Sequence, residues 1–166
     1  MDQERGQLRA LTAARGDVLD AVLETLIPAD EHGPGAGEAR VLRYVDGALA
    51  AELHDELGFY EAGIDATDEW ARARYGKGFA DLDGEQRAAV LTEVQGGTAE
   101  GFQGSSAGFF MGLRELALQG MFGDPRHGGN AGYAGWELLG YPGPRWEVPQ
   151  EEQMMDAVVE PVWRRD

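Results

Sequence analysis

Cysteine is absent from this sequence of 166 residues, and its absence removes several kinds of chemistry at once. The chain can form no disulfide, carry no thiol nucleophile, and hold no zinc ion or iron–sulfur cluster through cysteine. The three histidines, His32, His54 and His127, do not pair at the short helical spacing that zinc sites use. The sequence therefore predicts no metal site in this chain.

Positive charge is scarce. There are 14 Lys and Arg against 30 Asp and Glu, which gives a formal net charge of −16. DNA, RNA and anionic membrane surfaces all attract clustered basic side chains, and this composition does not favour such clusters. We therefore expect a soluble chain with no nucleic-acid partner.

Long apolar runs are also missing. No stretch approaches the roughly 20 apolar residues that a membrane span needs, so direct insertion into a membrane is not expected. Residues 1–15 lack the apolar core of a secretory signal peptide. We expect a cytoplasmic location, or alternatively a periplasmic one reached by export with a partner that carries the signal.

Apolar residues make up 43% of the sequence, enough to bury one core in a chain of this length. Their spacing is helical, and no strand-like alternation of useful length occurs. Thr12 is a candidate N-cap, and Asp83 with Gln86 has the form of a capping box. The sequence predicts an all-α, compact, single-domain helical bundle over residues 1–166, with helices at about 12–27, 37–57, 60–75, 83–94 and 98–121.

The last of these helices is unusually rich in glycine, with Gly101, Gly104, Gly108 and Gly112. Glycine destabilises a helix interior by about 1 kcal/mol relative to alanine. The four glycines indicate either close approach of a neighbouring backbone, which we favour, or a frayed or kinked first half. Gly120 is expected to end the helix in the left-handed conformation.

Residues 123–143 are rich in glycine and aromatic residues, and one short helix is expected over 133–139. Asp124 and Pro125 favour a turn, and the run from Gly128 to Asn130 tolerates positive φ. This region should therefore be a tightly folded loop. Trp136 and Tyr141 are large anchors that either cover the core or contact a partner.

Two kinds of functional site bear on the glycine-rich loop. The glycines at 128–132 are not preceded by a hydrophobic strand, as a dinucleotide site requires, so we expect no cofactor in this chain. Asp124 and His127 could form an acid–base pair, which leaves an independent enzyme as an alternative.

Several elements of the C-terminal half occur in a fixed order and resemble the signature of the gluconate 2-dehydrogenase subunit 3 family. The elements are Gly120 to Phe122, Asp124-Pro125, Gly128-Gly129-Asn130, Gly135-Trp136 and Gly140-Tyr141-Pro142-Gly143. The N-terminal half is similar to the family as well. It carries Leu11-Thr12, the run from Leu26 to Asp30, Tyr44-Val45-Asp46, and Tyr75-Gly76 followed by Phe79 and Leu82.

The resemblance implies a small helical subunit bound to a large FAD-dependent oxidoreductase of the glucose–methanol–choline type. FAD and the oxidation of a sugar, sugar acid or glycoside would belong to that partner, and some such complexes add a cytochrome c subunit. The small subunit would stabilise the large one without catalysing the reaction. An assembly or export chaperone for the same flavoprotein is the alternative.

The sequence departs from the family pattern at two points, and each departure leads to a prediction about this chain. Many members begin with a twin-arginine leader, and its absence here favours a cytoplasmic complex. His127 stands where an aromatic residue is often found, and it could reach the partner's active site.

We expect residues 1–11 and 145–166 to be extended tails that wrap a partner. The predicted contact residues are Phe122, Asp124, Pro125, His127, Gly128, Gly129, Asn130, Trp136, Tyr141 and Pro142.

Overall fold

A computed structural model describes residues 8–154, 157 and 159–163 of the chain. Over these residues the secondary structure is helical without strands, which confirms the all-α prediction. The helices are α1 (Ala13–Leu26), α2 (Val41–Ala50), α3 (Leu57–Tyr75), α4 (Gly84–Gln95), α5 (Ser106–Phe122) and α6 (Ala134–Leu138). Short 3-10 turns occur at His54–Glu56, Phe79–Asp81, Pro125–His127, Ala131–Tyr133 and Gln150–Gln153.

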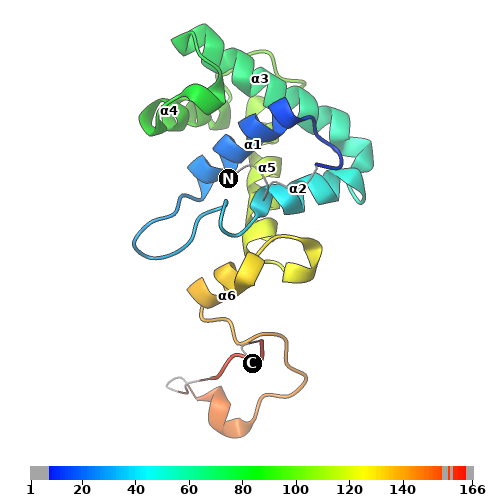
Figure 1. The fold of residues 1–166 in the computed structure, drawn as a ribbon, viewed down its shortest axis with the longest axis vertical. Helices are drawn as coiled ribbons and strands as arrows, with labels where there is room; N and C mark the ends of the chain where they lie inside the picture. The colour runs from blue at the N-terminus through cyan, green and yellow to red at the C-terminus, as the bar shows by residue number, and fades with distance from the viewer. Residues whose placement is uncertain (1–7, 155–156, 158, 164–166) are drawn as a thin grey trace.

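Helix α5 is the centre of the fold. It contacts α1, α2, α3, α4 and α6, and the other helices surround it (Figure 1). Its inner face buries Phe109, Leu113 and Met121 against apolar side chains of the surrounding helices. Beyond α6 the chain continues as an irregular segment that extends away from the helices (Figure 1). The core therefore lies among helices α1 to α5, which are called the body from here on. The C-terminal region projects from one end of the body (Figure 1).

The predicted helix starts are confirmed where a side chain caps the helix. Thr12 accepts a hydrogen bond from the backbone N–H of Arg15 at 3.4 Å. Asp83 accepts from the N–H of Gln86, whose side chain accepts from the N–H of Asp83 in return. Because such caps satisfy free N–H groups within a few residues, they can be read from local sequence.

The predicted helix at 37–57 is wrong at both ends. Arg40 has φ +56°, so the helix begins only at Val41. It stops at Ala50, where the N–H of Leu53 bonds to the carbonyl of Ala48 at 2.8 Å and closes the last turn. The next helix accordingly starts at Leu57, three residues before the predicted start.

The predicted helix at 98–121 is wrong over its first eight residues. Gly101 and Gly104 have φ of +87° and +79°, and Ser105 caps α5 by accepting from the N–H of Gly108 at 3.2 Å. Further along α5, a Cβ atom on Gly112 would lie 2.9 Å from the hydroxyl of Tyr60. Glycine thus serves two purposes here: positive φ before the helix, and close packing within it.

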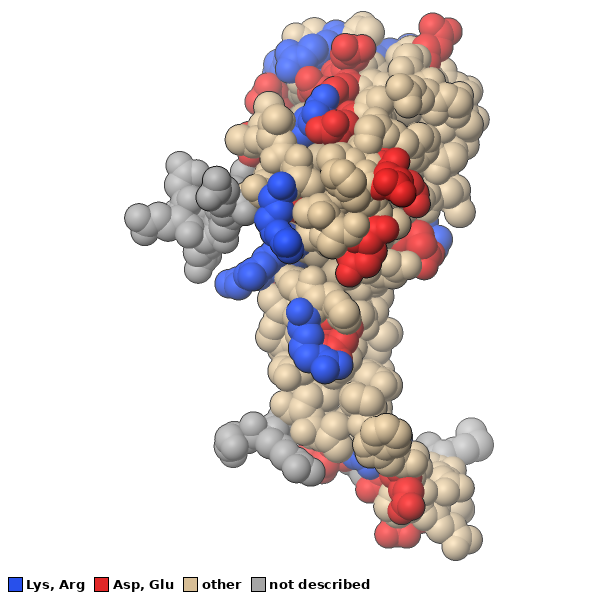
Figure 2. Space-filling model, turned by 90° about the vertical axis from the view of Figure 1, so that its right-hand side faces the viewer, with Lys and Arg blue, Asp and Glu red and all other residues tan. Residues whose placement is uncertain are grey.

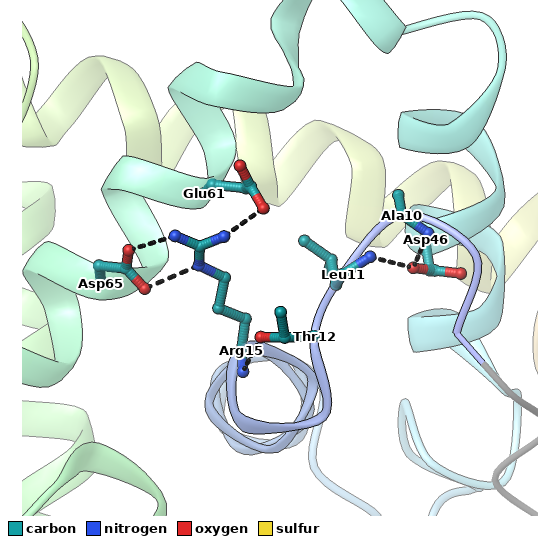
Figure 3. Close-up of polar contacts among 7 residues, drawn as sticks. All are labelled: Ala10, Leu11, Thr12, Arg15, Asp46, Glu61 and Asp65. Carbon is teal, nitrogen blue, oxygen red and sulfur yellow. Dashed lines mark hydrogen bonds and ion pairs between the residues drawn. The ribbon is translucent and has the colours of Figure 1, made fainter.

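Asp46 fixes the chain that precedes α1. Its buried carboxylate accepts the backbone N–H groups of Arg9, Ala10 and Leu11 at 2.6, 3.0 and 3.0 Å. Figure 3 shows Ala10 and Leu11 beside Asp46. Residues 8–11 therefore lie against α2 and pack on the core. The rest of the predicted N-terminal tail, residues 1–7, lies outside the described residues.

Arg15 joins α1 to α3. Its guanidinium donates to Asp65 through Nε at 2.9 Å and Nη2 at 2.7 Å, and through Nη1 to Glu61 (Figure 3). The hydrogen bonds from Arg15 lower the pKa of the Asp65 carboxyl. This bridge holds the polar edges of the two helices together. No helix among the described residues is long and apolar enough to cross a membrane.

Candidate partner interface

The C-terminal end of α5 is capped by the residues that follow it. Residues 120–143, which are the end of α5 and the chain after it, are called the signature segment from here on. The last carbonyl groups of a helix have no partner within the helix and need one outside it. The carbonyl of Gln119 accepts the N–H of Gly123 at 2.8 Å. The carbonyl of Gly120 accepts the N–H of Asn130 at 2.7 Å. The indole of Trp136 donates to the carbonyl of Phe122 at 2.8 Å.

Gly120 does not end the helix, contrary to the prediction. It lies inside α5, which continues to Phe122 and stops at Gly123, where the backbone is extended. A Cβ atom on Gly120 would lie 2.9 Å from Val41 and 3.1 Å from Tyr44. Glycine is needed here because α2 crosses α5 closely, and the left-handed conformation plays no part.

Asn130 forms hydrogen bonds to three parts of the signature segment. It is fully buried and has φ +44°, a conformation that asparagine tolerates better than most residues. Its side-chain amide donates to the carbonyl of Gly123 at 2.8 Å and accepts the N–H of Gly135 at 2.8 Å. With the bond to Gly120, this one residue ties α5, the loop and α6 together.

Two glycines let the loop approach α5. A Cβ atom on Gly129 would lie 2.2 Å from the carbonyl oxygen of Gly120, and one on Gly135 would lie 2.0 Å from that of Met121. Neither position has room for a side chain. The predicted tight folding of this region follows from these contacts, and the short helix expected at 133–139 is present as α6.

Asp124 and Arg126 form a local pair at the start of the loop. The carboxylate of Asp124 accepts the backbone N–H of Arg126 at 3.0 Å, its Nε at 3.0 Å and its Nη2 at 2.7 Å. The side-chain hydrogen bonds from Arg126, aided by the backbone one, hold the pKa of Asp124 at about 2. Pro125 opens the 3-10 turn that follows.

The proposed acid–base pair of Asp124 and His127 is not assembled. The carboxylate of Asp124 accepts its side-chain hydrogen bonds from Arg126, and among the described residues no side-chain hydrogen bond joins it to the exposed His127. The hydrogen bond between the two residues runs from the backbone N–H of His127 to the carbonyl of Asp124 at 3.1 Å.

The glycines of the loop do not form a phosphate cradle. The N–H of Asn130 is bonded to Gly120, and the N–H of Ala131 is bonded to the carbonyl of Ala39 at 3.1 Å. The segment before the loop is the helix α5, whereas a dinucleotide site follows a strand. Among the described residues there is also no cluster of three potential metal ligands.

An aromatic cluster covers the end of the signature segment. The ring of Tyr133 stacks on that of Trp163 at 4.8 Å, and Trp136 meets Tyr141 edge-on at 5.0 Å. The indole of Trp163 donates to the carbonyl of Tyr141, and the N–H of Val162 donates to that of Pro142. Sequence reasoning missed Trp163, because the C-terminal tail has no periodicity that would place it.

Burial divides the predicted contact residues into three groups, of which the largest is partly buried: Phe122, Asp124, Pro125, Gly128 and Pro142. Gly129, Asn130 and Trp136 are buried and shape the loop from inside. His127 and Tyr141 are exposed and accessible to a partner. Other exposed apolar side chains end α6 or follow it: Leu138, Leu139, Trp146, Val148 and Met154. None of them was among the predicted contact residues, although the last three lie in the tail at 145–166 that was predicted to wrap a partner.

The family model described as gluconate 2-dehydrogenase subunit 3 matches residues 13–143. The chain belongs to the gluconate 2-dehydrogenase subunit 3 family. The matched region ends at Gly143. It therefore includes the signature segment and excludes the exposed residues from Trp146 onward. Comparisons with curated proteins and with solved structures found no match. The family name points to a subunit of a dehydrogenase complex.

Proposed function

We propose that this chain is the non-catalytic small subunit of a flavin-dependent dehydrogenase or oxidase. Its partner would be a large FAD-binding subunit of the glucose–methanol–choline type that acts on sugars, sugar acids or glycosides. The chemistry would take place in the partner, and this chain would stabilise it. A cytochrome c subunit would be a further member of the complex where electrons leave through haem.

One observation carries the proposal: large apolar side chains are exposed at one end of the molecule. Leu138, Leu139, Tyr141, Trp146 and Met154 each expose more than a third of their surface. Apolar groups gathered on a surface mark interaction sites, and tryptophan and tyrosine are frequent anchors of interfaces. Leu138, Leu139 and Tyr141 belong to the hydrogen-bonded signature segment, which would hold them in place for binding.

The residues of the signature segment support a binding role over a catalytic one. Its polar groups are used to cap α5 and to close the loop, as the bonds of Asn130 illustrate. Such a preformed surface would need little ordering on association, which favours binding.

Purification of the tagged chain from its native organism, followed by an absorption spectrum, tests this proposal. We expect a yellow complex in which a large flavoprotein accompanies the chain in a fixed ratio. Oxidation of sugars and glycosides should then be found in the complex and not in the isolated chain. A colourless chain that purifies alone would contradict the proposal. A partner present during assembly but missing from the mature flavoprotein would instead indicate an assembly chaperone.

A further inference from the structure

Two exposed arginines lie at the start of α2, next to the signature segment. Arg43 is in the first turn of the helix, and Arg40 is the residue just before the helix, whose carbonyl accepts the N–H of Arg43 at 3.1 Å. A Cβ atom on Gly128 would lie 3.5 Å from Cγ of Arg43 and 3.7 Å from its Nε. The hydrogen bond from Ala131 to the carbonyl of Ala39 joins the same two segments. This side of α2 therefore faces the loop at 128–131.

Neither Arg40 nor Arg43 forms an ion pair with any carboxylate in the part of the chain that the structure describes. Among the described residues, ion pairs to a carboxylate are formed instead by Arg15, Arg72, Arg74, Arg126 and Arg145. The nearest acidic groups along these segments are engaged: Glu38 accepts the N–H of Gly35, and Asp124 holds Arg126.

Arg126 lies on the same loop, two residues before Gly128. It is paired with Asp124, yet 86% of its side chain is exposed. Arg40, Arg43 and Arg126 are together called the arginine patch. Figure 2 shows basic side chains gathered on one edge of the molecule where the body narrows, while acidic and basic groups are intermixed at the top.

The backbone of Arg40 gives a second reason to look for a role in its side chain. Its φ of +56° and ψ of +39° lie in the left-handed region, which residues with a Cβ atom rarely adopt. Glycine or asparagine would suit this backbone better. Since the Arg40 side chain neither caps α2 nor forms an ion pair among the described residues, the fold itself does not explain the arginine.

We infer that the arginine patch binds a carboxylate-rich face of the large subunit, beside the apolar contacts of the C-terminal segment. The inference rests on the proposed function and adds the chemistry of the partner's surface. Guanidinium groups bind carboxylates through paired hydrogen bonds, and arginine is enriched at protein interfaces. A nucleic acid is a poorer match, because the net charge of −16 repels a polyanion outside this small patch.

The arrangement has a kinetic consequence. A patch of positive charge on an acidic molecule orients it toward an acidic surface, so that only one side approaches productively. Complementary charges of this kind raise the association rate and make it depend on salt. The apolar contacts would then determine how slowly the complex dissociates.

The test measures association of the chain with the flavoprotein that co-purifies with it, by surface plasmon resonance at low and high salt. Arg43→Glu should slow association about tenfold or more at low salt, and the difference should nearly vanish at high salt. Arg40→Gly removes a side chain and relieves the backbone, so it should fold at least as well and still associate more slowly. Lys77→Glu, in the turn after α3 at the far end of the body from α6, is the matched charge reversal (Figure 1). It should associate at the wild-type rate.

Each outcome of these association measurements either supports or overturns the inference. Wild-type association rates for both Arg43→Glu and Arg40→Gly at low salt would overturn the arginine patch while leaving the proposed function intact. Equal slowing by Lys77→Glu would also overturn it, because the effect would then follow net charge alone. If no flavoprotein accompanies the wild-type chain, the proposed function fails first and the inference fails with it.

Discussion

Asn130 donates its backbone N–H to the carbonyl oxygen of Gly120 across 2.7 Å, ten residues earlier in the chain. The bond links the last turn of α5 to a loop that returns alongside it. The side chain of Asn130 adds two more bonds, to Gly123 and Gly135. A single residue in the left-handed conformation thus determines how the C-terminal region sits on the helical body.

Replacing Asn130 should separate the contribution of its side-chain hydrogen bonds to stability from the cost of its left-handed backbone. Asn130→Ala loses two side-chain hydrogen bonds, worth about 1 kcal/mol each, and places alanine at positive φ, which costs about 1 kcal/mol more. We expect the free energy of unfolding to fall by about 3 kcal/mol, measured by urea denaturation. Asn130→Gly loses the same bonds without the strain, so its loss should be about 1 kcal/mol smaller. Equal stability of the two variants would argue against strain at this position.

The close approach of the loop to α5 can be tested at Gly135. A Cβ atom there would lie 2.0 Å from the carbonyl oxygen of Met121, so Gly135→Ala must push α6 away from α5. We expect a loss of at least about 2 kcal/mol, seen as a lower melting temperature. Gly47→Ala, inside α2 with open space around it, should stabilise the chain by about 1 kcal/mol. A harmless Gly135→Ala would show that the loop is not packed as described.

Asp46 should control the order of the chain before α1. Removing its carboxylate in Asp46→Ala leaves three backbone N–H groups without their acceptor. We expect a loss of about 3 kcal/mol, since bonds to a charged acceptor are stronger than neutral ones. Hydrogen exchange at Arg9, Ala10 and Leu11 should speed up more than exchange in the middle of α5. Unchanged protection of these three amides would contradict the assignment.

The Asp124–Arg126 pair predicts a pH effect with a definite sign. Because the pKa of Asp124 is held at about 2, its stabilising contribution is complete above the ordinary carboxyl pKa of about 3.9 and is lost as pH falls through about 2. Arg126→Gln should raise the pKa of Asp124, measured by NMR titration of its carboxyl carbon. The rise should be incomplete, because the backbone N–H of residue 126 still donates to Asp124. Arg72→Gln, which removes an arginine paired elsewhere with Asp68, should leave this pKa unchanged.

Trp146 should matter for binding and not for folding. Its side chain is fully exposed, so Trp146→Ala should change the stability of the isolated chain by less than about 0.5 kcal/mol. If the C-terminal segment binds the large subunit, the same change should weaken the complex by about 2 kcal/mol, measured by titration calorimetry. Trp136→Ala is the contrasting variant, because Trp136 is buried and its loss should destabilise the chain itself.

Local signals in the sequence predicted those parts of the fold that depend on hydrogen bonds between residues close together in the chain. Thr12 and the pair Asp83 and Gln86 satisfy N–H groups beside them, and both caps are present. Glycine was harder to interpret, because one residue type meets different needs. Gly104 supplies positive φ and Gly120 supplies space for α2, and only the tertiary contacts distinguish these uses.

The tight fold of the loop was predictable from the order and spacing of its residues, among them Gly129, Asn130 and Trp136. These three residues were predicted to contact a partner and are instead buried. Trp146 and Met154 were not singled out, because they follow no periodic pattern and lie beyond the region that matches the family, although the tail at 145–166 as a whole was predicted to wrap a partner. Arg40 and Arg43 were also missed, because their relation to the loop depends on how α2 crosses α5.

The position of the signature segment on the end of α5 has a consequence for quality control during synthesis. Helix α5 packs against α1, α2, α3 and α4, so residues 120–143 in their bonded form lie at the end of a helix that the folded body surrounds. The residues after Phe122 also follow all the helices of the body along the chain. A partner that recognises this end of the molecule would therefore favour chains whose helical body has formed.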